Sequence, residues 1–413
     1  MSLSLQDLAF LTSAPGEALL ERLRMEELSD ANLLALSTRL RRDYTPEEAR
    51  AALELARLRE KAVEKFGADA QQMFFTRDAL EQASDPLVRR WKRSASGLSV
   101  IDLCCGIGSD SLAFARTASD VMGIDLDPVR VEMARLNAAA LNNSAHFETG
   151  DARTFQPDEP NAVIFYDPAR RDDEGNRLHH VERYEPPLSL IRQWDAFRIF
   201  VKLSPGVQID QVREYGGYVE FISVKGDLKE ALLSVFPRAK GAGEQTVQAA
   251  LLTDDAVYHW GHADEPPELR LSEPDAWLIE PDPALIRAGL VTDAAQAWGG
   301  AQLDDTIAYI TAAAPPETPW ARSWRILDWM PFSIKRLRDH LREQGVSTIT
   351  VKKRGTVVTP EVLMAQLKLK PNFGSESRTI VLTRCKGEQI ALICEDYDKR
   401  VQENFRSTKL MKG

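Results

Sequence analysis

The chain contains few of the residues that build metal sites and disulfide frameworks. It has 413 residues but only 4 cysteines and 6 histidines. Cys104 and Cys105 are adjacent, and neighbouring cysteines rarely form a disulfide. The cysteines and histidines also lack the spacing of metal ligands. We therefore expect no disulfide framework, no bound metal ion and a reducing compartment such as the cytoplasm.

Long apolar runs are missing as well. No segment reaches the roughly 18 consecutive apolar residues that a membrane-spanning helix needs. Residues 1–7 lack the basic stretch and apolar stretch of a signal peptide. Hydrophobic residues make up 44% and charged residues 28%, as in ordinary globular proteins. The length predicts about two to four domains, and we expect a cytoplasmic protein without membrane contact.

Negative charge dominates the chain but is unevenly distributed. The formal net charge is −10 at pH 7. Residues 320–413 contain 19 Lys and Arg against 10 Asp and Glu, a balance of +9, so the rest of the chain carries −19. A basic C-terminal part on an acidic body predicts a surface for a polyanion such as a nucleic acid. A solvated charged surface without a partner is the alternative.

Residues 1–95 have the pattern of a helical region. Thr45 and Glu48 form a capping box with a proline at the first helical position. This predicts a helix that runs to about Phe66 and stops at Gly67. Such a region either grips a substrate or stabilises the domain that follows.

Residues 96–255 alternate between apolar strands and helices, which predicts a parallel sheet. The stretch Val100–Asp110 is an apolar strand that breaks at Gly106 and Gly108 and then opens a helix. Glycines let the backbone approach a ligand and a helix start favours negative charge, so this stretch predicts a nucleotide site. Strands are expected near residues 100–104, 121–125, 145–148, 162–166, 198–203, 218–224 and 231–236, and helices near 109–118, 128–142, 187–193 and 208–214.

Four acids lie at or near the ends of apolar runs in this region, namely Asp102, Asp125, Asp151 and Asp167. The carboxyl ends of parallel strands face one crevice, so we expect these side chains to converge. Asp125 lies 23 positions after Asp102, the place of the acid that holds ribose hydroxyls in dinucleotide-binding folds.

The order of these motifs resembles the class I S-adenosylmethionine-dependent methyltransferases. Their first motif is acid-x-Gly-x-Gly-x-Gly, and here Cys104 replaces its first glycine, which implies a less tight turn. The resemblance implies a Rossmann-like α/β domain and S-adenosylmethionine as cofactor. A Rossmann-like domain for another nucleotide, or an inactive domain, is the alternative.

The same resemblance implies a set of cofactor-binding residues. They are Asp102, Gly106, Gly108, Asp110, Asp125 and Asp151. Asp125 would bind the ribose and Asp151, in Gly-Asp-Ala, would meet the adenine amine. The turn from Gly106 to Asp110 would hold the methionine portion.

The Asp-Pro-Ala-Arg-Arg stretch that begins at Asp167 lies where the family has an Asp-Pro-Pro-aromatic substrate motif. The proline would fix the Asp167 carboxylate beside the methyl acceptor, so Asp167 is a candidate catalytic residue. Arg170 replaces the family's aromatic residue, so a base would stack on Tyr166, Tyr184 or Arg170 itself, and an exocyclic amine target is in doubt. Arg170 and Arg171 either contact substrate phosphates or pair with the acids that follow.

Lys202 is unusual because it lies in the apolar run 198–203, where an ammonium needs a partner. Ribose 2′-O-methyltransferases of class I resemble this pattern, with an Asp after strand four and a Lys on strand five. Glu230 could supply their acid, but their first lysine has no counterpart here. Lys202, the second candidate catalytic residue, is either a base with a depressed pKa or a structural partner of Asp167.

Clustered prolines in the stretch after residue 256 mark a domain boundary. We expect a small α+β module over 256–322, a further domain over 323–396 and a tail over 397–413.

The C-terminal part resembles a bacterial methyltransferase family in which a small ferredoxin-like module precedes a THUMP-like domain. The resemblance implies a ferredoxin-like module over 256–322 and a THUMP-like domain over 323–396. The segments Val351–Gly355, Thr379–Arg384 and Ile279–Arg287 carry this resemblance. THUMP domains bind structured RNA, typically tRNA, so an RNA partner is implied. The basic run Lys352, Lys353 and Arg354 would then grip phosphates without reading the sequence.

These patterns lead to one leading hypothesis and two alternatives. The leading hypothesis is a cytoplasmic S-adenosylmethionine-dependent methyltransferase that acts on tRNA or rRNA by direct methyl transfer to a positioned nucleotide. A methyltransferase for protein or a small molecule is the first alternative. The second is an RNA-binding scaffold whose methyltransferase domain is catalytically silent.

Overall fold

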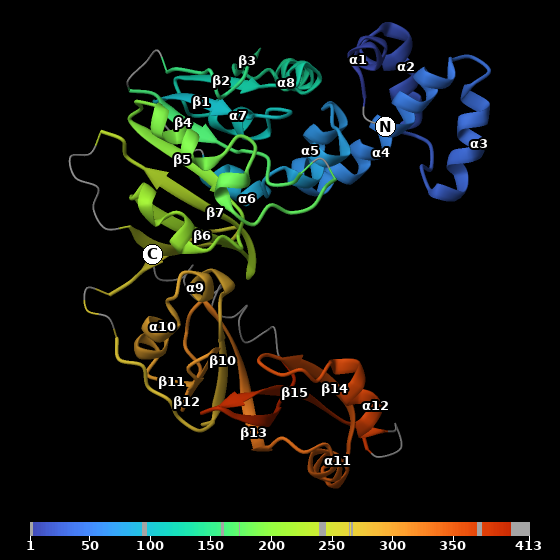
Figure 1. The fold of residues 1–413 in the computed structure, drawn as a ribbon. Helices are drawn as coiled ribbons and strands as arrows, with labels where there is room; N and C mark the ends of the chain where they lie inside the picture. The colour runs from blue at the N-terminus through green and yellow to red at the C-terminus, as the bar shows by residue number, and fades with distance from the viewer. Residues whose placement is uncertain are drawn as a thin grey trace. The chain divides into compact units, whose positions relative to one another are not determined.

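The structure is a computed structural model that describes residues 3–92, 97–157, 161–172, 174–238, 245–263, 265, 267–369 and 374–397. The expected boundary at residues 95 and 96 lies outside the described residues, as does the expected tail apart from residue 397. The chain forms two compact units, each of which is described by itself (Figure 1). The first holds residues 1–224, 229–246 and 252–257, and the second holds 225–228, 247–251 and 258–413.

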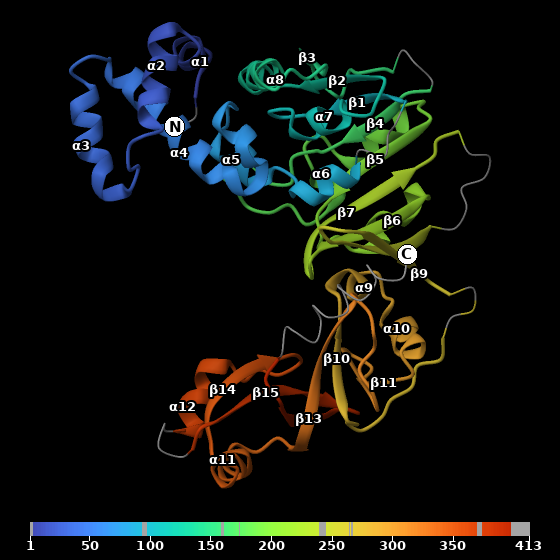
Figure 2. The ribbon, with the colours of Figure 1, turned by 180° about the vertical axis from the view of Figure 1, so that it is seen from behind.

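The N-terminal region is helical, as its sequence predicts. It contains α1 (Leu5–Leu11), α2 (Ala14–Leu23), α3 (Asp30–Leu40), α4 (Pro46–Phe66), the 3-10 helix η1 (Gly67–Gln71), α5 (Arg77–Gln82) and α6 (Pro86–Lys92). The capping box of Thr45 and Glu48 starts α4, and Gly67, with a φ of 59°, ends it. Helices α5 and α6 lie between α4 and the sheet of the first unit (Figure 2).

A nine-stranded sheet organises the first unit, although most residues of its last two strands are counted with the second unit. Its strands are β1 (Ser99–Leu103), β2 (Asp120–Asp125), β3 (His146–Thr149), β4 (Val163–Tyr166), β5 (Arg198–Leu203), β6 (Tyr218–Val224), β7 (Asp227–Val235), β8 (Thr246–Leu252) and β9 (Val257–Gly261). Their order is β3-β2-β1-β4-β5-β7-β6-β8-β9. Strands β1 to β5 pair in parallel, and β7 pairs antiparallel with β5. The ends of β1, β2, β4 and β5 therefore lie at one edge, where the four acids were expected to meet.

The structure differs from the sequence prediction at several elements of this unit. Helix α7 (Ser109–Phe114) is shorter than expected, whereas α8 (Pro128–Ala140) matches closely. The expected helices at 187–193 and 208–214 are 3-10 helices: η3 (Leu188–Gln193), η4 (Ile209–Gln211) and η5 (Arg213–Tyr215). Prolines precede both segments and two glycines follow the second, which leaves too few residues to propagate an α-helix. Strands β8 and β9, which we did not predict, extend the sheet.

The second unit is built on a seven-stranded sheet in the order β11-β12-β10-β13-β16-β15-β14. The strands are β10 (Trp277–Pro281), β11 (Ala301–Asp304), β12 (Ile307–Ala312), β13 (Ala321–Pro331), β14 (Val346–Lys353), β15 (Glu376–Cys385) and β16 (Glu388–Cys394). The helices are α9 (Pro283–Arg287), α10 (Val291–Ala297), α11 (Ile334–Glu343) and α12 (Pro360–Leu367). The module boundary expected at residues 322 and 323 falls inside β13, which pairs with β10 on one side and β16 on the other.

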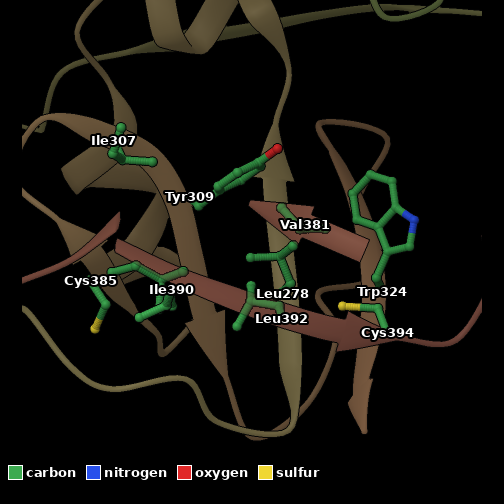
Figure 3. Close-up of a cluster of buried hydrophobic side chains, with 10 residues drawn as sticks. Leu278, Ile307, Tyr309, Trp324, Val381, Cys385, Ile390, Leu392 and Cys394 are labelled. Carbon is green, nitrogen blue, oxygen red and sulfur yellow. The ribbon is translucent and has the colours of Figure 1, made fainter. Parts of the chain in front are cut away.

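Two clusters of buried side chains hold this sheet together. In one, Leu278 from β10, Tyr309 from β12, Trp324 from β13 and Leu392 from β16 pack together (Figure 3). In the other, leucines of α11 and α12 pack on β15 and β16. Because the first cluster draws on strands from both sides of β13, the two expected modules share one core.

Candidate active site

The glycine-containing turn between β1 and α7 forms the floor of the candidate site. Cys104, Gly106 and Gly108 have φ values of 63°, 57° and 80°. Cys104 therefore adopts the left-handed backbone conformation that favours glycine, at a steric cost of about 1–2 kcal/mol. The expectation that this turn is less tight than in the family stays a prediction.

The two glycines are needed for different reasons. A Cβ on Gly108 would lie 2.7 Å from the Phe147 ring, so this glycine permits close packing of α7 on β3. A Cβ on Gly106 would meet no atom within 4 Å, so Gly106 leaves open space above the turn. The backbone at Gly106 can thus approach a bound molecule closely.

The thiol of Cys104, at the same turn, is a poor nucleophile. Burial raises its pKa well above the ordinary value of 9.0, and the carboxylates of Asp125 and Asp167 raise it further. The thiolate is the reactive form of cysteine, and a raised pKa disfavours it.

The acids expected to hold the cofactor are fixed by short contacts. Asp102 is 1% exposed and its Oδ2 accepts a hydrogen bond from the Ser111 hydroxyl at 2.5 Å. Asp125 accepts from the Gly106 N–H at 2.8 Å. Asp151 accepts from the backbone N–H of residue 153 at 2.9 Å. These hydrogen bonds hold the three carboxylates in place. All three residues lie at or near the ends of the parallel strands, where the sequence placed them.

A cleft of about 840 Å³ brings most of the expected site residues together. Its lining includes Asp102, Gly106, Asp110, Asp125, Asp151, Asp167, Arg170, Arg171 and Lys202. Gly108 is not part of the lining, because it packs against Phe147. Lys352, Lys353 and Arg354 belong to the second unit.

Lys202 forms the centre of a buried cluster of charges. Its Nζ lies 2.7 Å from Oδ2 of Asp167, 4.0 Å from Oδ2 of Asp110 and 3.5 Å from the Gln82 carbonyl. Burial by itself would lower the pKa of Lys202, but Asp167, Asp110 and Glu230 outweigh it and raise the pKa above the ordinary value of 10.5. A permanently charged ammonium has no lone pair to accept a proton. The geometry therefore favours the structural pair with Asp167 over the role of a base.

The aromatic residues proposed for base stacking are not accessible. Tyr166 is fully buried, and its hydroxyl donates to the Pro186 carbonyl at 2.6 Å. Tyr184 is 1% exposed. The prediction that either ring stacks on a substrate base is therefore wrong, which leaves the Arg170 plane among the three candidates.

The two arginines after Asp167 bind main-chain oxygens. Nη1 of Arg170 donates to the Leu203 carbonyl at 3.0 Å, and Nη1 of Arg171 donates to the Gly175 carbonyl at 2.9 Å. Within the described part of the chain, neither side chain pairs with a carboxylate. Their positive charges therefore remain available at the cleft.

One part of the site comes from the N-terminal region, for which the sequence left open a role in gripping a substrate or in stabilising the next domain. Ala79, Gln82 and Ala83 line the cleft. The Ser84 hydroxyl lies 3.1 Å from Asp110 Oδ2 and 3.5 Å from Glu230 Oε2. None of these residue types in isolation predicts a site, because each is common on ordinary helices.

The basic run Lys352, Lys353 and Arg354 lies at the end of β14, and its three side chains have different surroundings. Lys352 donates to Glu280 at 2.7 Å, and Arg354 lies 3.5 Å from the same carboxylate. Lys353 is exposed. Successive side chains of a strand point to opposite faces, so the three cations do not act as one group.

The nine-stranded sheet and its acid-lined cleft define a Rossmann-like class I methyltransferase fold. Residues 100–169 match a family model described as a methyltransferase domain, residues 321–396 one described as THUMP domain-like, and residues 4–62 a domain of unknown function. The chain is 33% identical over 341 residues to an uncharacterized S-adenosylmethionine-dependent methyltransferase of Mycobacterium tuberculosis, covering 80% of this chain and 92% of the relative. The chain therefore belongs to the family of S-adenosylmethionine-dependent methyltransferases.

Two further similarities differ in extent. A crystal structure of a protein described as a methyltransferase, from Porphyromonas gingivalis W83, aligns with a TM-score of 0.70 at 20% identity and covers 90% of this chain and 99% of that one. The two proteins therefore share their fold over most of this chain, including residues of both units. The human tRNA (uracil-5-)-methyltransferase homolog A is 38% identical over 73 residues, which is 17% of this chain and 12% of that protein.

The residues of the cleft fit S-adenosylmethionine, the cofactor of the family. The open space above Gly106 can admit a ligand, and the cleft lies within the roughly 300–1,000 Å³ of small-molecule sites. Carboxylates suit the hydroxyls and the amine of a nucleoside. Among the described residues, no group of three or more His, Cys, Asp and Glu side chains could hold a metal ion, and no helix is long and apolar enough to cross a bilayer.

Proposed function

We propose that this enzyme methylates a nucleotide of structured RNA, tRNA or rRNA. The observation that carries the proposal is the union, in one chain, of a methyltransferase domain with a basic region that matches a THUMP domain-like model. The local similarity to a methyltransferase named for tRNA uracil supports the same substrate class.

Three parts of the cleft are proposed to bind the cofactor: Asp125, Asp151 and the backbone at Gly106. S-adenosylmethionine supplies an activated methyl group on a sulfonium. In the proposal, Asp125 accepts hydrogen bonds from the ribose hydroxyls and Asp151 from the adenine amine. The backbone at Gly106 lies against the methionine portion, because no side chain blocks it. Asp110, which is expected to help hold the methionine portion, lines the cleft and also lies 4.0 Å from the Lys202 ammonium.

Asp167 is proposed to orient the methyl acceptor. Its Oδ2 is held by Lys202 at 2.7 Å, and its side chain is 24% exposed. Lys202 thus holds one carboxylate oxygen of Asp167. The other oxygen is left to accept a hydrogen bond from the nucleotide that receives the methyl group. Alignment of the acceptor is the main task of such an enzyme, since methyl transfer needs no further activated group.

Arg170 and Arg171 are proposed to bind phosphates beside the reacting nucleotide. Both line the cleft, and both bind main-chain carbonyls. A guanidinium matches the geometry of a phosphate well. Lys353 of the second unit would add an exposed cation that positions RNA without reading its sequence.

The proposal is tested by transfer of labelled methyl from S-adenosylmethionine to fractions of cells that lack the gene. The fractions are small RNA, ribosomal RNA, protein and small molecules, and Asp125→Ala is the control. We expect label in one RNA class with the natural enzyme and none with the control. Label in protein or small molecules instead would refute an RNA substrate.

A further inference from the structure

One wall of the cleft comes from the N-terminal region, outside the methyltransferase domain that the family model covers. Helix α5 contributes Ala79 and Gln82 to the lining, and Ala83 follows directly after this helix. All three residues precede residues 100–169, which the methyltransferase family model matches. A helix from a separate region that borders the site can determine which acceptor is admitted.

Polar contacts at both ends hold this wall in a fixed position. The Asn137 side chain of α8 accepts from the Phe74 N–H at 2.6 Å and donates to the Phe74 carbonyl at 3.2 Å. After α5, the buried Ser84 lies against Asp110. The ammonium of Lys65 donates to the carbonyls at the end of α5 over 2.8–2.9 Å. The wall is thus attached on one side to α8 and on the other to the charge cluster.

Gln82 lies on the acceptor side of the cleft. Its backbone carbonyl is 3.5 Å from the Lys202 ammonium, which also binds Asp167. Gln82 is exposed and is one of the residues that line the cleft. Among the described residues that line the cleft, Gln82 alone carries a neutral carboxamide, and it forms no side-chain hydrogen bond within the described part of the chain.

We propose that Gln82 recognises the methyl acceptor by pairing its amide N–H and its amide oxygen with adjacent acceptor and donor groups on the edge of a nucleobase. A carboxamide presents both groups at once, which is how glutamine reads a base edge. The charged side chains around it suit phosphates and hydroxyls rather than a neutral base. The inference rests on the proposed function, because it assumes a nucleotide acceptor.

The test compares three variants on the small RNA or ribosomal RNA that accepts label. Gln82→Ala removes both groups but keeps the backbone carbonyl that meets Lys202. Gln82→Glu keeps the shape but removes the donor. Glu81→Ala is the control, because Glu81 is exposed and does not line the cleft. The readouts are kcat/KM for RNA and the Kd of S-adenosylmethionine by calorimetry.

We expect Gln82→Ala and Gln82→Glu to lower kcat/KM for RNA by about 10- to 100-fold, the range for loss of a paired base contact. The Kd of S-adenosylmethionine should stay within about twofold, and Glu81→Ala should match the natural enzyme. If kcat/KM for RNA is unchanged in the Gln82 variants, or if cofactor binding weakens as much as kcat/KM falls, the proposed role of Gln82 is overturned. The proposed function is not affected by either result. Label that enters protein or small molecules would instead overturn the proposed function and, with it, the nucleobase.

Discussion

Two lysine–carboxylate pairs, one in each unit, share the same local geometry. In the first unit Lys202 lies 2.7 Å from Asp167, and in the second Lys352 lies 2.7 Å from Glu280. A distance alone would assign them the same role. Their surroundings differ in burial and in the sign of the excess charge.

The first pair is an acid-rich cluster in the interior. The Lys202 side chain is 4% exposed, and Asp110 and Glu230 join Asp167 in raising its pKa. The second pair has the opposite balance. Lys352 and Arg354 share Glu280, the Lys352 side chain is 25% exposed, and its ammonium lies 4.1 Å from the centre of the Trp324 ring.

The difference in burial and charge balance gives the two pairs different roles: the Lys202 pair is a fixed part of a site, and the Lys352 pair belongs to a surface suited to a polyanion. A buried cation surrounded by several carboxylates cannot leave without exposing them to one another. A carboxylate that is shared by two partly exposed cations leaves net positive charge, which attracts phosphates over a distance. The same contact therefore supports alignment in one unit and, under the proposed function, attraction of RNA in the other.

The largest effect is expected for Lys202→Met, which removes the cation from its buried carboxylates. We expect the free energy of unfolding of the first unit to fall by about 3–5 kcal/mol and methyl transfer to be lost. Urea unfolding and labelled-methyl transfer measure the two effects. Lys335→Met, at an exposed position of α11, is the matched control. A variant as stable as the control would remove the distinction between the two pairs.

The pH dependence of stability sharpens the same point. The folded pKa of Lys202 is raised above 10.5, so its stabilisation is complete below the unfolded pKa and is lost only as pH rises through the folded value. The difference in stability between the natural enzyme and Lys202→Met should therefore be constant from about pH 6 to about pH 9. Urea midpoints across that range measure it. A difference that shrinks toward pH 8 would mean that the ammonium titrates there.

A smaller effect is expected for Glu280→Gln, which leaves Lys352 and Arg354 without their shared carboxylate. Both cations are partly exposed, so the free energy of unfolding should fall by only about 1–2 kcal/mol. Under the proposed function, the added positive charge should tighten RNA binding and steepen its salt dependence. Filter binding at several salt concentrations tests this. Weaker binding with an unchanged slope would indicate that this face does not meet RNA.

The placement of Asp125 and Gly106 at the cleft could be predicted from sequence because both residues follow strands. Asp125 and Gly106 sit where the parallel-sheet topology places them, and their contacts agree with that placement. The turn at Cys104 could not be predicted, because a residue type does not fix its own φ when the surrounding loop determines it. Gln82 and Ser84 lie outside the motifs in sequence, and the packing of α5 brings Gln82 to the cleft and Ser84 to Asp110.

The basic run illustrates another limit of the sequence. Lys352, Lys353 and Arg354 appear as one cluster in the printed sequence, but the pleat of β14 sends neighbours to opposite faces. Their partner, Glu280, is 72 positions upstream of Lys352, and no local pattern connects the two residues. Strand alternation was predictable here, whereas the identity of the partner was not.

The smallest effect is expected for Lys353→Ala. Lys353 is exposed, so the free energy of unfolding should change by no more than about 0.5 kcal/mol. If Lys353 contacts a phosphate, the slope of log binding constant against log salt should become shallower by about 1. Lys352→Ala, by contrast, removes a cation whose charge Glu280 already offsets and should change stability more than the slope. Equal slopes for both variants would mean that their different exposure does not decide which lysine meets RNA.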